Sequence, residues 1–92
     1  MWAWMTFKVL IKAKVLDDLP QSRKKQIAEA LKDLKNGFQG GNKCKIEGYK
    51  EDVYRLRIGN YRAFYTVDFE ENAIVVFDIL TQEQAHKKYG RL

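Results

Sequence analysis

Apolar residues recur along this chain with two different periods, and each period predicts a type of secondary structure. Between residues 6 and 12, Phe7, Val9 and Ile11 occupy alternate positions. A period of two predicts a strand with one apolar face toward a core. Lysines lie on its other face, where they would discourage pairing with a second chain, so this strand suits the edge of a sheet.

Two stretches with a helical period come next. Val15, Leu16 and Leu19 favour a short helix over residues 13–19, which Pro20 stops. A longer helix follows, and its apolar residues recur at helical spacing: Ile27, Ala30, Leu31 and Leu34. We expect Ser22 to cap the start of this helix and Asn36-Gly37 to end it. The short connection predicts a helical hairpin whose apolar stripes lie on one face of the sheet.

The second half of the chain is predicted to contain a loop, strands and a short helix near its end. Residues 38–51 contain glycines and show no period, so we expect a long loop there. A nearly unbroken apolar run over residues 74–80 predicts a central strand. After it, Thr81 can cap a short helix, and Gln84 would complete a capping box.

The segment Val53–Tyr65 carries the most informative chemistry, and it reads as a β-hairpin. Its strand-forming residues flank the Gly-Asn pair at positions 59 and 60, which tolerates the positive φ of a two-residue turn. Such a turn pairs Arg57 with Arg62. Arg55 lies two residues before Arg57 and so shares its face of the strand. Three arginines therefore converge on one face.

Like charges at neighbouring sheet positions are destabilising unless something anionic lies over them. One interpretation is a solvated polar face whose guanidinium groups spread into water or pair with Asp52, Asp68 or Glu70. The other is a phosphate-binding platform, because each arginine offers a planar fork of donors that suits phosphate oxygens. We favour the platform, which indicates a nucleic-acid backbone as the ligand.

Composition changes this picture only slightly. At 92 residues the chain has room for a single domain, residues 1–92, and its net charge of +5 favours an acidic partner. The lone cysteine, Cys44, can form neither an internal disulfide nor a metal pair. The sequence shows no signal peptide and no apolar run of spanning length, so we expect a cytoplasmic protein without a membrane partner.

Asp78 is an exception within the apolar run of the last strand. A carboxylate in such a strand is costly to bury without a partner. We therefore expect a basic group beside Asp78, with one of the hairpin arginines as the first choice.

The order of elements and two motifs resemble the RelE/ParE superfamily of toxins from toxin–antitoxin pairs. Lys45-Ile46-Glu47-Gly48 is similar to the family pattern K-L-x-G. The segment Val53–Tyr65 is similar to Y-R-[LIV]-R-[IV]-G-[DN]-[YF]-R-x-[LIVF]-Y. The resemblance covers nearly all of the chain. It implies an α+β fold with two N-terminal helices packed on a small antiparallel sheet, a RelE-like microbial RNase-type fold.

RelE-type members cleave mRNA in the ribosomal A site, whereas ParE-type members act on DNA gyrase. The resemblance implies a metal-independent endoribonuclease with no cofactor, in which the 2′-hydroxyl attacks the neighbouring phosphate. It implies three partners: a cognate antitoxin that neutralises the toxin, mRNA, and the ribosome.

The resemblance also implies roles for individual residues. Arg55, Arg57 and Arg62 would bind the phosphate and stabilise the transition state, Tyr89 would stack on a base, and His86 would transfer a proton. Lys43 and Lys45 are further candidates for RNA binding. Arginine is a poor general base at neutral pH, which leaves Glu47 or His86 as the candidate base.

One departure from the family keeps two rival functions open. Relatives commonly carry an arginine soon after the last strand, where this chain has Leu80-Thr81-Gln82-Glu83-Gln84. A missing cation weakens the stabilisation of an anionic transition state. The rivals are an inhibitor of gyrase or another protein target, and a catalytically silent RelE-like binding protein.

Overall fold

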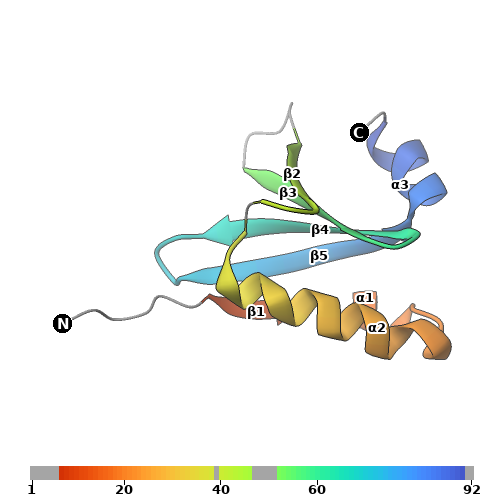
Figure 1. The fold of residues 1–92 in the computed structure, drawn as a ribbon, viewed down its shortest axis with the longest axis horizontal. Helices are drawn as coiled ribbons and strands as arrows, with labels where there is room; N and C mark the ends of the chain where they lie inside the picture. The colour runs from red at the N-terminus through yellow and green to blue at the C-terminus, as the bar shows by residue number, and fades with distance from the viewer. Residues whose placement is uncertain (1–6, 39, 47–51, 91–92) are drawn as a thin grey trace.

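The computed structural model describes residues 7–38, 40–46 and 52–90, which form a layered α+β fold (Figure 1). Its strands are β1 (Lys8–Ile11), β2 (Lys43–Ile46), β3 (Val53–Ile58), β4 (Tyr61–Asp68) and β5 (Ala73–Thr81). Its helices are α1 (Ala13–Asp17), α2 (Gln21–Lys32) with the 3-10 turn η1 (Asp33–Asn36), and α3 (Gln82–Tyr89). In this described part no helix combines the length and apolar character needed to cross a bilayer.

The strands form one sheet in the order β1-β5-β4-β3-β2, so β1 is an edge strand as predicted. The sheet is mixed: the expected antiparallel pairing holds for every pair except β1 with β5. β1 runs parallel to β5, with Lys8 opposite Ala73, whereas every other pairing is antiparallel. A parallel pair requires a long connection, and the one between β1 and β5 contains both N-terminal helices and strands β2, β3 and β4.

The main core lies between α2 and one face of the sheet. Ile27, Leu31 and Leu34 are fully buried against strand residues such as Tyr65 and Ile74. Figure 1 shows α2 beneath the sheet and α3 on the opposite side of it. Apolar residues of α1 also pack against this core, so the expected placement of the N-terminal helices on one face is confirmed.

A bulge in β5 decides which side chains face α2 and which face α3. Phe64 pairs with Asp78 but its neighbour Tyr65 pairs with Val76, so Phe77 is an extra residue on β5. An extra residue reverses the alternation of side chains along a strand. Val76 and Ile79 accordingly both belong to the α2 core although three positions separate them. We call the α2 side the helix face and the opposite side the outer face.

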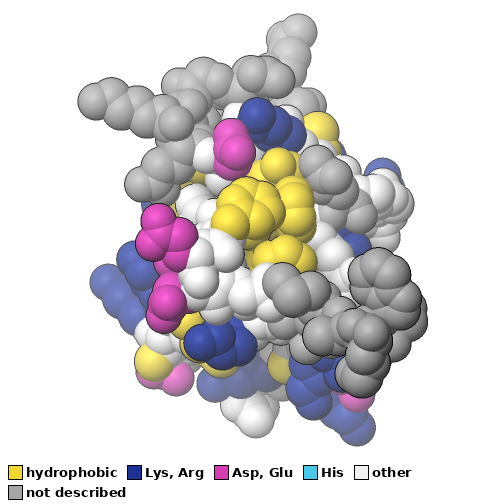
Figure 2. All heavy atoms as spheres, turned by 90° about the vertical axis from the view of Figure 1, so that its left-hand side faces the viewer, with side chains coloured by type: hydrophobic (Ala, Val, Ile, Leu, Met, Phe, Trp, Pro, Cys, Tyr) yellow, Lys and Arg dark blue, Asp and Glu magenta, His cyan; other side chains and the backbone are white. Residues whose placement is uncertain are grey.

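Aromatic rings gather at the end of the sheet where β4 turns into β5. Phe38 makes edge-to-face contacts with Phe7, Tyr54 and Phe69, at centroid distances of 5.6, 5.2 and 5.5 Å. Figure 2 shows hydrophobic side chains in the middle of this end, and Phe69 is 62% exposed. The Tyr65 hydroxyl donates to the Phe38 carbonyl at 2.7 Å and ties this cluster to the core.

The structure corrects two local predictions, the cap of α2 and the loop 38–51, and confirms the capping box of α3. The start of α2 is Pro20 at the N-cap, without a side-chain cap, so Ser22 does not cap this helix. The predicted loop 38–51 contains strand β2, which pairs with β3. The capping box at α3 is present. Thr81 Oγ1 accepts from the Gln84 backbone N–H at 3.2 Å, and Gln84 Oε1 accepts from the Thr81 backbone N–H at 3.0 Å.

Candidate functional site

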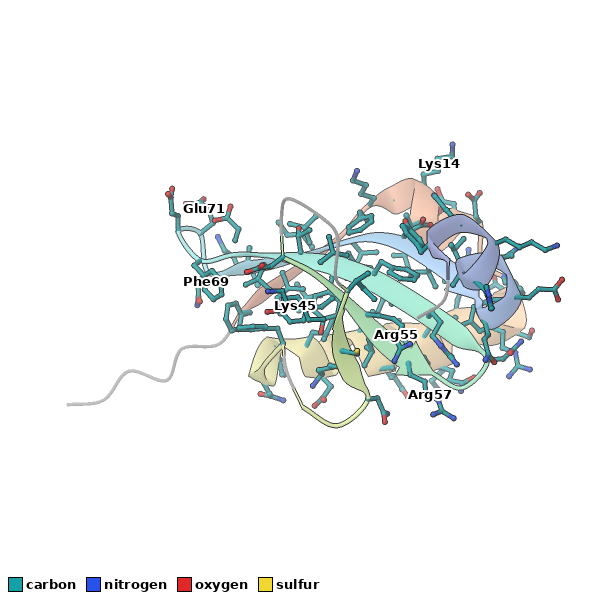
Figure 3. All side chains as sticks on the ribbon, turned by 90° about the horizontal axis from the view of Figure 1, so that it is seen from above. Lys14, Lys45, Arg55, Arg57, Phe69 and Glu71 are labelled. Atoms are coloured by element: carbon teal, nitrogen blue, oxygen red, sulfur yellow. The ribbon has the colours of Figure 1, made fainter. Side chains whose placement is uncertain are left out.

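Three arginines lie together on the outer face, as the hairpin pattern predicted. Arg57 is directly opposite Arg62, and Gly59 has the positive φ, 56°, that the two-residue turn requires. Arg55 is two residues along β3 on the same face. Figure 3 shows Arg55 and Arg57 on β3, away from the end of the sheet that carries Phe69 and Glu71. We call Arg55, Arg57 and Arg62 the arginine cluster.

Arg62 is the most confined member of the cluster. It is only 7% exposed, and its Nη1 donates to the carbonyls of Gly59 at 2.8 Å and Tyr61 at 2.9 Å. Burial, followed by the charges of Arg55 and Arg57, lowers the pKa of the Arg62 guanidinium from its ordinary value. The hairpin turn thus fixes one cation where two others oppose it. An anion over this face would relieve that repulsion.

The other two arginines differ in exposure. Arg57 is exposed, whereas Arg55 is half-buried and its Nε is a buried donor with no hydrogen-bond acceptor in the described structure. A buried donor left without an acceptor costs about 1–3 kcal/mol. An anion that drew this side chain outward would supply the missing acceptor.

The arginine cluster is not neutralised by the neighbours that a solvated polar face would use. Asp52 accepts from Lys45 at 3.1 Å, and Asp68 Oδ1 accepts from the amides of Glu70 and Glu71. Within the described part of the chain, none of the three arginines forms an ion pair. The cluster therefore keeps its positive charge.

The structure does not bring Lys43 and Lys45 to the cluster. In the β2–β3 ladder they lie opposite Leu56 and Tyr54, which face α2. Lys43 pairs with Asp33 at 3.6 Å and Lys45 pairs with Asp52 at 3.1 Å. Two residues of β2 share the outer face, the exposed Cys44 opposite Arg55 and Ile46 opposite Val53. Sequence reasoning missed this because it treated β2 as a loop.

The tail helix does reach the outer face. The Tyr89 ring lies over Phe64, with centroids 4.3 Å apart, and the Tyr89 hydroxyl donates to Asp78 Oδ2 at 2.7 Å. Lys88 Nζ donates to the same oxygen, also at 2.7 Å. The expectation of a basic partner for Asp78 is confirmed, but that partner is Lys88 of α3 rather than a hairpin arginine.

His86 lies on the exposed side of α3, next to the hairpin turn. It lines an open hollow of about 680 Å³ together with residues of α3 and the turn: Asn60, Thr81, Gln82, Glu83 and Lys87. The backbone N–H of Gln82 donates to the backbone carbonyl of Asn60 at 2.8 Å, which joins the start of α3 to that turn. The other candidate base, Glu47, lies outside the described residues.

The start of α3 carries the neutral and acidic residues noted in the sequence. Gln82, Glu83 and Gln84 are all exposed there, and Glu83 pairs with Lys87 at 3.4 Å. The cations of α3 come from its last turn, where Lys87 and Lys88 lie. In the described residues, no group of three or more His, Cys, Asp and Glu side chains is placed to hold a metal ion.

Comparisons with known proteins agree with this architecture. The family model described as the ParE toxin of the parDE type II toxin–antitoxin system matches residues 11–86. A protein of Methanocaldococcus jannaschii whose name describes it as a RelE1 toxin is 35% identical over 88 residues, which is 90% of this chain and 98% of that protein.

Solved structures show the same fold. The archaeal RelE–RelB complex of Pyrococcus horikoshii contains a chain that is 27% identical, with a TM-score of 0.67, and the match covers 88% of this chain and all of that one. The RelBE2 toxin–antitoxin complex of Mycobacterium tuberculosis gives a TM-score of 0.72 at 19% identity, covering 86% and 94% of the two chains. On these matches, the chain belongs to the RelE/ParE family of type II toxins.

Proposed function

We propose that this toxin is an endoribonuclease that cleaves translated mRNA at the ribosome, and that a cognate antitoxin neutralises it. The observation that supports the proposal best is the arginine cluster, in which three cations share one rigid face and lack ion-pair partners in the described residues. The names of the RelE relatives and the RelB complexes of the solved structures support the same assignment.

The proposed chemistry is attack of a 2′-hydroxyl on the adjacent phosphate, which forms a 2′,3′-cyclic phosphate and breaks the bond from phosphorus to the 5′-oxygen of the next nucleotide. The attacking hydroxyl gives up a proton, and the leaving 5′-oxygen takes one. This step adds negative charge to the phosphate oxygens, so fixed cations that meet this charge lower the barrier. Arg62, held by the hairpin turn, stabilises the transition state, while Arg55 and Arg57 hold the phosphate. Such an arrangement needs no movement of Arg62 at the moment of reaction.

In this proposal a side chain of α3 transfers the proton. His86 is exposed beside the hairpin turn and is the candidate for accepting or returning a proton, while Tyr89 presents its ring on the outer face as a platform for a base. Lys43 and Lys45 have no part in the phosphate site, because both pair with carboxylates on the helix side of the sheet.

A second candidate function is inhibition of gyrase or another protein target. Two observations favour it: the matching family model is that of ParE toxins, and α3 begins with Gln82, Glu83 and Gln84 where an RNase would gain from a cation. In that case the arginine cluster would dock a protein. A catalytically silent relative that only binds an antitoxin is the remaining alternative.

Regulated expression in bacteria separates these functions. Wild type is compared with Arg62→Ala and with Arg23→Ala, which removes the same charge from the exposed surface of α2, while growth and the 5′ ends of ribosome-associated mRNA are followed. We expect growth arrest with new mRNA ends in wild type and Arg23→Ala, and neither in Arg62→Ala. Arrest without new mRNA ends would contradict the RNase and support a protein target, while absence of arrest would support the silent relative.

A further inference from the structure

The interaction that neither the hairpin pattern nor the family resemblance explains is the one between Asp78 and the end of α3. Asp78 is the only acidic residue of β5, and its side chain is 14% exposed. One of its oxygens, Oδ2, accepts from both Lys88 Nζ and the Tyr89 hydroxyl at 2.7 Å. A carboxylate with one cationic and one neutral donor makes short, strong hydrogen bonds.

The bulge at Phe77 is what aims Asp78 at α3. With strict alternation after Val76, residue 78 would point into the α2 core and Ile79 would point away from it. The extra residue reverses this order, so Asp78 shares the outer face with Phe64, its partner in the ladder. A bulge that redirects one polar side chain costs a regular ladder position, and such bulges often serve a site.

The helix that Asp78 holds is short. α3 has eight residues, of which only Ala85 is buried, and a helix of this length is not stable in isolation. Its first turn is fixed by the capping box at Thr81. Its last turn is fixed by Asp78 and by the contact of the Tyr89 ring with Phe64.

We propose that Asp78 is a positioning residue that holds Tyr89 in place on the outer face, beside the arginine cluster, for contact with RNA. This inference rests on the proposed function, because it assigns the placement of a group that RNA would meet. Phe64, beneath the Tyr89 ring, lies opposite Arg55 in the β3–β4 ladder, and Arg62 lies two positions along β4. Holding Tyr89 therefore fixes an aromatic ring relative to the cluster.

Asp78 joins Lys88 and Tyr89 through one carboxylate oxygen, which accepts a hydrogen bond from each of them. Lys88 also lies 5.5 Å from the centre of the Tyr89 ring. The three side chains thus form one unit, and we call it the α3 clamp.

The test uses two readouts on the full chain. The first is the NMR shift of the Tyr89 ring protons, which the Phe64 ring displaces from the values of a solvated tyrosine. We expect Asp78→Asn to move these shifts toward the solvated values. The matched control Glu83→Gln removes one carboxylate that bonds a lysine of the same helix, and it leaves the Tyr89 shifts unchanged. Unchanged shifts in Asp78→Asn would overturn the proposal.

The second readout is the rate of RNA cleavage in Asp78→Asn, Tyr89→Phe and the double variant. Tyr89→Phe keeps the ring but loses its bond to Asp78, so each single change should slow cleavage, by about 10- to 100-fold for a misplaced group. The double variant should be no slower than the slower single variant. Multiplied effects would overturn the proposal. If the wild type cleaves no RNA, the proposed function fails, and the Tyr89 shifts alone decide whether Asp78 places the ring.

Discussion

The two faces of the sheet are built from the same strands but have opposite effects on stability. Along β3 and β4, residues of the helix face such as Leu56 and Ala63 are buried in the core, whereas the outer face of the same strands carries Arg55, Arg57 and Arg62. The core residues gain stability from the removal of apolar surface from water. The arginines oppose one another and lower stability. The difference indicates that burial on the helix face offsets the repulsion among the charges of the outer face.

The largest effect on stability is expected from the helix face. Leu31 is fully buried in α2, so Leu31→Ala should lower the free energy of unfolding by about 2–5 kcal/mol through lost burial and a cavity. Chemical denaturation measures this loss. A loss below about 1 kcal/mol would show that the core is not packed around α2 as described.

A smaller effect on the same face is expected from Tyr65→Phe. The lost hydrogen bond to Phe38 should cost about 0.5–1.5 kcal/mol. Burial, followed by the nearby Tyr54, raises the pKa of the Tyr65 phenol well above its ordinary value. The unfolded chain therefore loses this proton first as pH rises, and stability falls above about pH 10.

Denaturation between pH 8 and pH 11 sharpens this prediction. The alkaline loss of stability should be steeper in wild type than in Tyr65→Phe, because the variant lacks the buried phenol. Parallel curves for the two proteins would contradict the burial of an ionisable Tyr65.

The smallest effect on stability is expected from Arg57→Ala on the outer face. Removing an exposed cation opposite Arg62 should leave the free energy of unfolding unchanged or raise it slightly, because a like-charge pair is lost. RNA binding should weaken, and the slope of log K against log salt should fall by about 0.7 for one lost phosphate contact on a single strand. Arg23→Ala is the control, and an equal change of slope in that control would show binding by net charge alone.

The sequence predicts the arginine cluster because local rules determine it. The turn at Gly59-Asn60 sets the register of β3 and β4, and the register places Arg57 opposite Arg62. The capping box of α3 is local in the same sense, since Thr81 and Gln84 are three residues apart. Both features hold in the structure.

Features that depend on distant parts of the chain were predicted less well. Alternation in β1 reveals a strand but not its direction, so the parallel pairing with β5 could not be read from it. β2 is a four-residue edge strand with polar residues, and its own sequence does not predict a strand. It is held in a strand by its pairing with β3. The pattern of residues 38–51 predicts a loop, and a loop gives no register that would place Lys43 and Lys45 opposite Leu56 and Tyr54.

The sequence predicts only part of the α3 clamp. Asp78 stood out as a carboxylate in an apolar strand, and the need for a basic partner followed from the cost of burying it. The choice between an arginine and Lys88 depended on the bulge at Phe77, which leaves no signature in the apolar run. Side-chain direction in β5 therefore required the structure.

The most direct test of the central claim is cleavage of mRNA in programmed ribosomes by the purified toxin. Wild type and Arg23→Ala should cut the mRNA at equal rates, whereas Arg62→Ala should be slower by about 10²–10³-fold, the effect of removing one fixed donor from an anionic transition state. Each variant is first shown to be folded by circular dichroism. Equal rates in Arg62→Ala and Arg23→Ala, or no cleavage by folded wild type, would contradict the account.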